Sequence, residues 1–549
     1  MNESPTSQDS LLQRRIYGTL GLSVLVGLYL LVGLTGHDPW RGDDARHLGP
    51  VVSMLRGEGW LLPMLGGEPM YEYPPLYYWT ASVLAWAASG FLAAHEGARL
   101  ASVLFTAMGI FLVARTAEAL YGRPTRTPAA LLTLGTLGLV IHAHETQPLL
   151  ALFAMLALTL RGLARVPVQP VGGSLQAGLG SALAFLAAGL PGLLLSLPLF
   201  PLALLLSPDC RSPRASGGLL LGLSLALVLM AAWPLALHLL EPAQFNRWLA
   251  AQWLDIQLHA PVLADLGTQA ELLGWFTWPL WPIALWSLWR AGRKFATLPW
   301  LLPGLSLMLV LVWLIFIGEP RQARLIPLVP ATALLAAGGV PSLRRGAANA
   351  FDWFALMTFG VFAILVWLGW TAQAFGWPPG LARHVAHIAP DFVLTAAGTQ
   401  LVLGVLICAA WLGFVWRLPR TASRGPASWA MGMTMLWCLA VVLLMPWFDH
   451  SRSYRPMVRS LELALAGEPP ACIAAEPLPP GVRASLDYFG AIRVVRVVED
   501  TSPCPLLLRI GERPSASATI APEWHIIWEY RHGGGKRQEL YRLYRRTPS

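Results

Sequence analysis

Long apolar runs separated by short polar stretches dominate the first 450 positions of the chain. A helix needs about 20 mainly apolar residues to cross the hydrocarbon core of a bilayer. Thirteen segments approach this length, and we expect each to span a membrane: 16–36, 97–119, 127–143, 148–165, 175–190, 191–207, 216–238, 272–290, 297–318, 324–341, 352–376, 392–414 and 427–447.

The segment 75–93 is ambiguous, because it is apolar but begins with proline and is rich in Tyr and Trp. Counting it as a span would invert the orientation of everything that follows. If it lies along the interface instead, every loop on the side of the N-terminus carries at least two positive residues, which is typical of cytoplasmic loops. The sequence therefore predicts a cytoplasmic N-terminus over 1–15, a membrane domain over 16–449 and a first outer loop at about 37–96.

The last hundred residues, 450–549, are more polar and contain short runs rich in β-forming residues. These runs and two helical stretches predict a small α/β domain outside the membrane: strands at 492–498, 505–510, 525–530 and 540–543, and helices at 454–467 and 481–489. Cys472 and Cys504 lie in this domain, and they are candidates for a disulfide if the compartment is oxidising.

The composition agrees with a membrane protein, since 55% of the residues are hydrophobic and only 13% are charged. A soluble globular protein has about 25% charged residues. The formal net charge of +9 comes from positive residues scattered among short loops, so it does not indicate nucleic-acid binding. No cysteine and histidine spacing typical of zinc is present.

An acidic pair, Asp43-Asp44, follows directly after the first predicted span. One interpretation is solvated charge at the interface. The other is a carboxylate at the membrane surface that accepts a proton from an attacking hydroxyl or stabilises a developing cation.

The motifs around this pair favour the second interpretation. The chain reads Asp43-Asp44-x-Arg46-His47, then Glu72-x-Pro74-Pro75-x-Tyr77-x-Trp79, then Ala98-Arg99-Leu100. In this order and spacing the motifs resemble the lipid-linked-sugar transferases of glycosyltransferase family 39. That family is of the membrane-embedded GT-C type and includes aminoarabinose transferases of lipid A and protein O-mannosyltransferases. The match is best over 37–165, with a weaker echo in Arg324-x-x-Pro327-x-x-Pro330.

The resemblance implies a polytopic α-helical membrane protein of GT-C type with about 13 transmembrane helices and a small C-terminal extracytoplasmic α/β domain. It places Asp43 at the principal catalytic carboxylate and Asp44 beside it. A leaving phosphate needs cationic partners, for which arginine is well suited. The candidate substrate-binding residues are Arg46, His47, Arg56, Glu72, Tyr73, Tyr77, His144, Glu145, Arg321 and Arg324.

Three positions depart from the family pattern, and the first, Asp44 in place of the family's second acidic residue, is a mild change. Tyr73 stands where the family has a lysine implied to touch the lipid phosphate, so another group must supply that charge. Gln147 stands where such families often carry an aspartate. His144 and Glu145 lie just before it, and three interpretations stay open for them: polar capping of a helix end, contact with substrate, and metal binding, for which their spacing is unfavourable.

The sequence thus predicts a hexosyl- or pentosyltransferase that takes its sugar from a polyprenyl-phosphate donor, with no cofactor and no divalent metal. We expect the acceptor to be an envelope glycolipid, glycan or protein on the outer face of the bacterial cytoplasmic membrane. The alternatives are a non-catalytic relative and a flippase-like transporter of lipid or glycan. The identity of the sugar and of the acceptor lies beyond the sequence.

Overall fold

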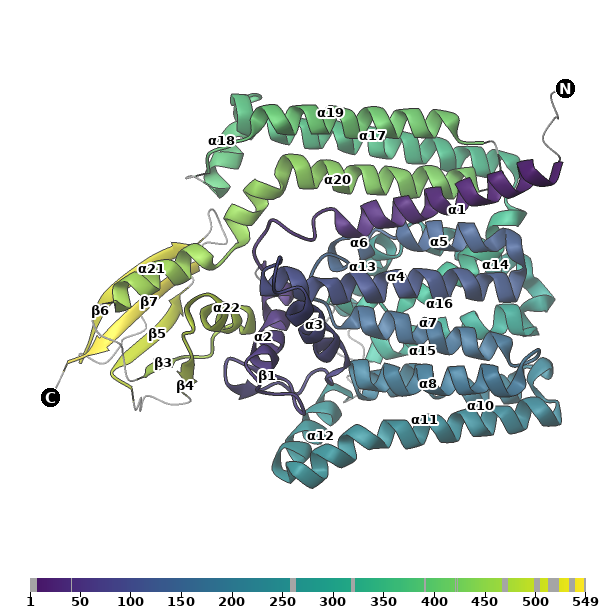
Figure 1. Ribbon diagram of the computed structural model, residues 1–549, viewed down its shortest axis with the longest axis horizontal. Coiled ribbons are helices and arrows are strands. Elements are labelled where there is room, and N and C mark those ends of the chain that lie inside the picture. The colour runs from purple at the N-terminus through teal and green to yellow at the C-terminus, as the bar shows by residue number, and fades with distance from the viewer. Residues whose placement is uncertain are drawn as a thin grey trace.

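Long helices form a bundle at one end of the molecule, and a small mixed sheet with two helices lies at the other end (Figure 1). The computed structural model describes residues 7–40, 42–256, 263–316, 321–389, 392–419, 421, 423–466, 472–497, 504–511, 523–532 and 539–547. Short elements lie between the bundle and the sheet: α2 (Asp43–Leu55), β1 (Met64–Leu65), β2 (Glu68–Pro69) and α3 (Leu76–Ala87).

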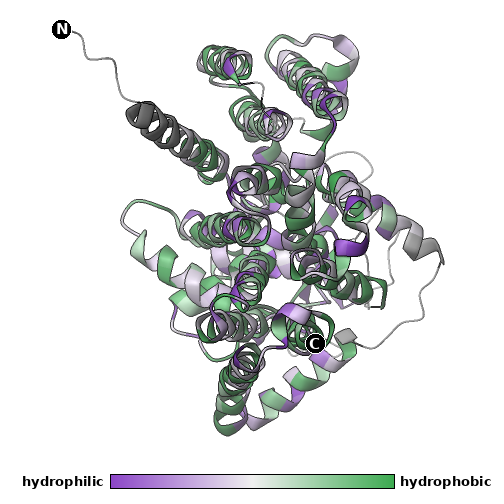
Figure 2. Ribbon diagram, turned by 90° about the vertical axis from the view of Figure 1, so that its right-hand side faces the viewer, coloured by the Kyte–Doolittle hydropathy of each residue, from purple (hydrophilic) through white to green (hydrophobic). Residues whose placement is uncertain are grey.

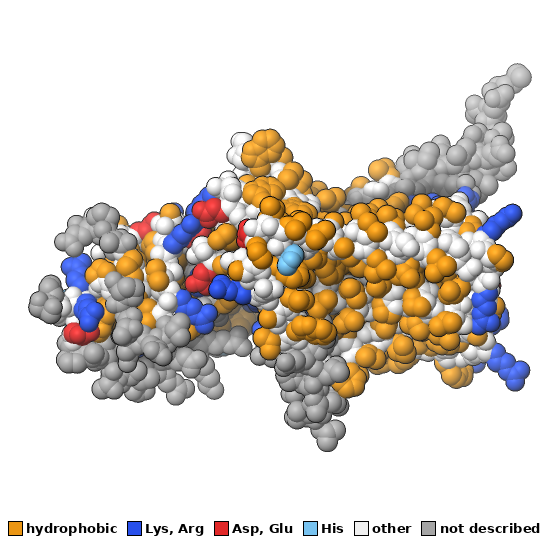
Figure 3. All heavy atoms as spheres, turned by 90° about the horizontal axis from the view of Figure 1, so that it is seen from below, with side chains coloured by type: hydrophobic (Ala, Val, Ile, Leu, Met, Phe, Trp, Pro, Cys, Tyr) orange, Lys and Arg blue, Asp and Glu red, His pale blue; other side chains and the backbone are white. Residues whose placement is uncertain are grey.

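Seven of the described helices are long and apolar enough to cross a bilayer: α4 (Ala94–Tyr121), α8 (Pro170–Ala188), α11 (Pro213–Leu240), α15 (Leu298–Phe316), α17 (Arg345–Phe375), α19 (Ala397–Arg417) and α20 (Arg424–Arg452). Viewed along their axes, the bundle helices are mostly hydrophobic (Figure 2). Hydrophobic side chains cover the visible flank of the bundle, while charged ones gather at its end and near the sheet (Figure 3). The chain is therefore a multi-pass membrane protein.

The predicted number of thirteen spans is not confirmed. Each predicted segment is helical over most of its length, but several are divided where glycine or proline interrupts the helix. For example, 127–143 divides into α5 (Arg126–Leu134) and α6 (Leu139–His142). The remaining described α-helices before the C-terminal domain are α1 (Ser7–Leu31), α7 (Leu149–Arg165), α9 (Leu190–Ser196), α10 (Leu199–Leu206), α12 (Pro242–Ile256), α13 (Leu263–Phe276), α14 (Leu280–Ala291), α16 (Leu328–Gly339) and α18 (Pro379–Ile388).

Helix α3 accounts for the ambiguous apolar segment 75–93. It has 12 residues, and at 1.5 Å per residue it is about 18 Å long, which is too short to cross a hydrocarbon core of about 30 Å. Its Tyr77 and Tyr78 are fully buried. This agrees with the prediction that the segment does not span.

The C-terminal sheet has five strands in the order β4-β3-β5-β7-β6. Strand β3 pairs in parallel with β4 and β5, and β7 is antiparallel to β5 and β6. The elements of the domain are α21 (Arg455–Leu465), β3 (Ile473–Ala475), α22 (Pro480–Gly490), β4 (Val494–Arg496), β5 (Leu506–Gly511), β6 (Trp524–His532) and β7 (Glu539–Arg546). The four predicted strands and both helices are present, and the short central β3 is the strand that the prediction missed.

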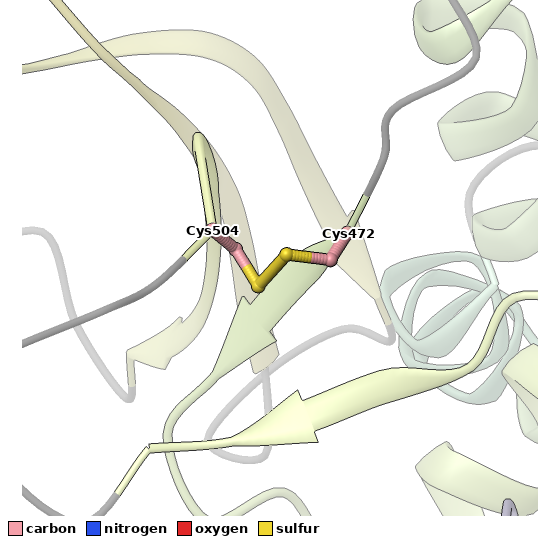
Figure 4. Close-up of a disulfide and its surroundings, with 2 residues drawn as sticks. All are labelled: Cys472 and Cys504. Carbon is pink, nitrogen blue, oxygen red and sulfur yellow. A yellow bond between two sulfur atoms is a disulfide. The ribbon is translucent and has the colours of Figure 1, made fainter.

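A disulfide joins Cys472 and Cys504, the pair singled out in the sequence (Figure 4). Cys472 immediately precedes β3, Cys504 lies two residues before β5, and these two strands are paired. The bond therefore ties together the starts of two neighbouring strands, with the Cα atoms 5.3 Å apart.

Helix α1 runs from the far end of the bundle toward the sheet, so the start of α1 and the C-terminal domain lie at opposite ends of the bundle (Figure 1). A chain that crosses the membrane an odd number of times has its two ends on opposite sides.

Candidate active site

The acidic pair opens α2, the first short helix between the bundle and the sheet. Gly42 precedes it with φ 105°, a backbone conformation that favours glycine. The turn separates the two carboxylates, because Asp43 is partly exposed while Asp44 is buried.

Asp44 is held on every side by donors. The Arg99 guanidinium donates to Oδ2 at 2.7 Å, and the backbone N–H groups of Trp40 and Thr146 donate at 3.1 and 2.7 Å. Burial opposes ionisation of Asp44, but Arg99 outweighs it and holds the pKa of the carboxyl at about 2. Asp44 is thus a positioning residue that joins α2 to α4 and to the loop before α7.

Asp43 is left facing a group of charged side chains from three parts of the chain. Arg46, one turn further along α2, forms an ion pair with Glu72. Arg321 Nη1 lies 3.9 Å from the other oxygen of Glu72. Burial raises the pKa of Glu72, and the charges of Arg46, Arg321 and Arg324 oppose that rise. The structure therefore gathers Asp43, Glu72 and three arginines, which are far apart in sequence.

His47, which is buried, and Tyr73, which is partly buried, lie beside these charges. The His47 ring meets the Tyr73 ring edge-on, with centroids 5.5 Å apart, and Nδ1 lies 2.9 Å from the Tyr78 hydroxyl. Burial lowers the pKa of His47 to about 3, so the imidazole is neutral near pH 7. Burial also raises the pKa of Tyr73. Neither side chain supplies a positive charge.

Glu145 approaches the acidic pair from the loop between α6 and α7. Its carboxylate lies 3.4 Å from His142 Nδ1. Burial raises the pKa of Glu145, and the charges of Asp44 and Asp43 add to that rise. Glu145 therefore belongs to the candidate site.

Three of the ten predicted substrate-binding residues lie elsewhere. Arg56 donates to Asp487 of α22 at 2.6 Å and serves the contact between the two domains. The Tyr77 hydroxyl is buried, 2.7 Å from Ser102 Oγ. The two ring nitrogens of His144 each lie 2.6 Å from a backbone carbonyl, and the ring stacks on Trp437.

The departure at Gln147 has a structural role. Its side-chain oxygen accepts from the backbone N–H of Leu149 at 3.3 Å, at the start of α7. Its own backbone N–H donates to the Tyr77 hydroxyl at 3.1 Å. Gln147 is fully buried, and it shapes the loop that presents Thr146 to Asp44.

The C-terminal domain docks on α2 through small residues and ion pairs. A Cβ added to Gly49 would lie 3.2 Å from Ala484 of α22, so the two helices approach closely. Arg493 pairs with Glu58 at 2.8 Å, and Arg483 pairs with Glu68 at 2.9 Å. Arg455 also pairs with Asp38. The first outer loop and the C-terminal domain are therefore in direct contact.

A cavity of about 580 Å³ lies at this contact, which is within the usual size of a ligand site. Its walls come from α2, the hairpin β1–β2, helix α12 and the C-terminal domain. The lining residues are Arg46, Leu65, Glu68, Pro69, Met70, Tyr71, Glu72, Arg247, Pro480, Arg483 and Arg496. Since Arg46 and Glu72 belong both to this cavity and to the group around Asp43, the cavity opens beside the candidate catalytic carboxylate.

Three of these arginines, Arg247, Arg483 and Arg496, were missed by sequence reasoning. Their role depends on how α12 and the C-terminal domain dock against the first loop, and no local motif records that docking.

A metal site has no support among the described residues, where no group of three or more His, Cys, Asp or Glu side chains is placed to hold an ion. The expected absence of a metal stays a prediction.

The fold is that of a membrane-embedded protein of GT-C type. The structure of ArnT from Cupriavidus metallidurans bound to undecaprenyl phosphate superposes with a TM-score of 0.69, covering 96% of this chain and 98% of that one at 17% identity. The apo form of the same protein gives a TM-score of 0.67. The fold class predicted from the sequence is therefore confirmed.

The sequence relatives are arabinosyl transferases. An undecaprenyl phosphate-α-4-amino-4-deoxy-L-arabinose arabinosyl transferase from Pseudomonas aeruginosa is 26% identical over 436 residues, which is 75% of this chain and 74% of the relative. A protein of the same name from Edwardsiella ictaluri is 27% identical over 304 residues, 53% of this chain and 50% of the relative. No protein-family model matches the chain. The predicted resemblance to lipid-linked-sugar transferases is confirmed by these relatives.

Proposed function

We propose that this chain transfers a 4-amino-4-deoxy-L-arabinose residue from undecaprenyl phosphate to a lipid A-type glycolipid. The partly exposed Asp43 carries the proposal, because its charge acts on Glu72, which lies in the wall of a cavity that four arginines line. Helix α2, which begins with Asp43, lies next to the apolar helix bundle. A site of this kind suits a substrate with an apolar tail and an anionic head. The arabinosyl transferases among the relatives supply the identity of the sugar and its carrier.

In the reaction, the bond between the anomeric carbon and the carrier phosphate breaks, and a new bond forms to an oxygen of the acceptor. Positive charge develops on the sugar ring, as in other glycosyl transfers. The Asp43 carboxylate stabilises that charge. If the acceptor oxygen belongs to a hydroxyl, Asp43 accepts its proton; if it belongs to a phosphate that is already ionised, no proton moves.

The leaving carrier phosphate requires positive charge close to Asp43. Arg46 and Arg321 flank Glu72 there, and Arg324 acts on the same carboxylate. Glu72 holds the guanidinium groups of Arg46 and Arg321 through these contacts, and the fork of N–H donors on a guanidinium group suits a phosphate. We assign the donor phosphate to this group of arginines.

The reaction takes place on the outer face of the bacterial inner membrane in this proposal, with the N-terminus in the cytoplasm and the C-terminal domain in the periplasm. The disulfide supports this orientation, because such bonds persist in oxidising compartments. The relatives do not require a protein acceptor, and the proposal includes none.

The test is transfer in membranes that contain the full-length protein, undecaprenyl phosphate-linked aminoarabinose and lipid A, followed by mass spectrometry of the glycolipid. We expect one added aminopentose with the wild-type protein and none with Asp43→Asn. Absence of the added sugar with the wild type, or full activity of the variant, would refute the proposal.

A further inference from the structure

The cavity between the first loop and the C-terminal domain carries more positive charge than its own carboxylates balance. Four arginines line it, and two glutamates oppose them. Glu72 pairs with Arg46, and Glu68 pairs with Arg483. Within the described part of the chain, Arg247 and Arg496 have no ion-pair partner at all, although both line the same cavity.

Arg247 and Arg496 come from different parts of the fold. Arg247 lies on α12, which follows the membrane helix α11, and Arg496 lies at the end of β4 in the C-terminal domain. Two guanidinium groups that line one cavity without a carboxylate partner among the described residues leave that cavity suited to an anion. The excess of two positive charges matches a phosphate monoester, which carries about −1.5 to −2 at pH 7.

Helix α12 also offers apolar contact next to Arg247. Trp253 and Leu254, on the same helix, are 61% and 63% exposed, and Leu239 and Leu240 at the end of α11 are 70% and 72% exposed. An anionic head at Arg247 and an acyl chain against these residues together fit a phosphorylated glycolipid better than a free anion.

We propose that Arg247, Arg483 and Arg496 form an acceptor-recognition site, which binds a phosphate group of the glycolipid acceptor and orients it toward Asp43. This deepens the proposed function and depends on it for the identity of the acceptor. The C-terminal domain, through Arg483 of α22 and Arg496 of β4, is then a specificity-determining part of the enzyme.

The donor phosphate is assigned to a different set of arginines. Arg46, Arg321 and Arg324 are the positive charges that act most strongly on Glu72, and Arg46 and Arg324 act on the pKa of Tyr73 as well, after burial. Arg247, Arg483 and Arg496 are not among them. Arg46 alone lines both places, so the two phosphate sites adjoin each other without coinciding.

The first experiment measures binding without turnover, so its result does not depend on whether transfer occurs. The full-length Asp43→Asn protein in detergent is titrated with short-chain glucosamine disaccharides that carry two, one or no phosphate groups. We expect Arg247→Gln and Arg496→Gln each to weaken binding of the phosphorylated probes by about tenfold, and to leave the unphosphorylated probe unchanged. Arg531→Gln removes an exposed arginine of β6 in the same domain and should bind as the parent does.

Arg496 and Arg247 have no protein partner to lose among the described residues, so these variants should fold normally. Unchanged binding of the phosphorylated probes would overturn the proposal. In the otherwise wild-type enzyme, the two variants should raise the KM for the acceptor about tenfold and leave kcat and the donor KM unchanged. A rise in the donor KM instead would reassign these arginines to the carrier phosphate and overturn the acceptor site.

Discussion

The two neighbouring carboxylates of α2 should respond in opposite ways to the same substitution. Asp44→Asn removes the negative charge that faces Arg99, and both side chains are at most 1% exposed. Asp43→Asn removes a partly exposed charge that acts on Glu72, a residue of the cavity wall. We therefore expect Asp44→Asn to destabilise the fold and Asp43→Asn to abolish transfer with the fold intact.

The loss of stability expected for Asp44→Asn depends on the hydrogen bonds that Arg99 keeps. Breaking a buried ion pair from one side costs about 3–5 kcal/mol. Arg99 still donates to the backbone carbonyls of Leu34, His37 and Asp38 at 3.3, 3.1 and 2.9 Å, which offsets part of the loss. Asparagine retains one oxygen acceptor, but its amide turns an N–H₂ group toward existing donors. We therefore expect the lower end of the range, about 3 kcal/mol.

Thermal unfolding in detergent measures this difference, with transfer assayed on the same preparations. Asp43→Asn should unfold at the wild-type temperature and show no transfer. Asp44→Asn should unfold at a clearly lower temperature, and its remaining activity should follow the fraction of folded protein. Equal unfolding temperatures for Asp44→Asn and the wild type would refute the reasoning that Asp44 holds the first loop to α4.

Three further predictions concern pH, the disulfide and the domain contact. Burial lowers the pKa of His47 to about 3, so below about pH 6.5 the unfolded chain binds a proton at this residue that the folded chain does not. His47 should therefore lower the free energy of unfolding by about 2 kcal/mol between pH 7 and pH 5. The dependence of the free energy of unfolding on pH should be weaker in His47→Gln, and an unchanged dependence would contradict the prediction. Replacing both Cys472 and Cys504 by serine opens a link between positions 32 residues apart and should cost about 3–4 kcal/mol, measured by urea unfolding with the Cys408→Ser protein as the control; equal midpoints would argue against a structural disulfide. Arg56→Met leaves the carboxylate of Asp487, which is 2% exposed, with Arg493 at 3.3 Å as its one remaining ion-pair partner among the described residues. The C-terminal domain should therefore become more sensitive to limited proteolysis, and an unchanged cleavage rate would show that Arg56 does not hold the domain.

Local patterns predicted the membrane part of the fold because a helix that spans the lipid requires a long run of apolar residues in the sequence. Twenty apolar residues in a row have few alternatives to a spanning helix. Helix boundaries are harder to predict where a span is divided, as at 127–143, because glycine interrupts the helix without interrupting the apolar run. Strand β3 was missed for a related reason: at three residues, Ile473–Ala475, it is too short to show alternation.

The site was predictable only as far as its motif. Asp43, Arg46, His47, Glu72 and Tyr73 come together as the motif suggested. Sequence spacing could not distinguish Asp43 from Asp44, because their difference depends on Arg99 and on the turn at Gly42. It also could not show that Arg56 is used for docking, since its partner Asp487 lies more than 400 positions away.

Tyr73 shows that charge at such a site depends on the surrounding fold. The resemblance implies a lysine there, and the partly buried tyrosine supplies no cation. Arg46, Arg321 and Arg324 surround Glu72 instead, so three positive charges face the two negative charges of Glu72 and Asp43.

If these arginines already provide the charge that the carrier phosphate needs, restoring the lysine adds nothing useful. Tyr73→Lys places a partly buried ammonium among three guanidinium groups, where like charges repel and desolvation penalises the ion. We therefore expect lower thermal stability and no decrease in the donor KM, with Tyr73→Phe as the control for loss of the hydroxyl. A donor KM several-fold below that of the wild type would show instead that the site lacks a cation, and that the three arginines do not replace the lysine of the family pattern.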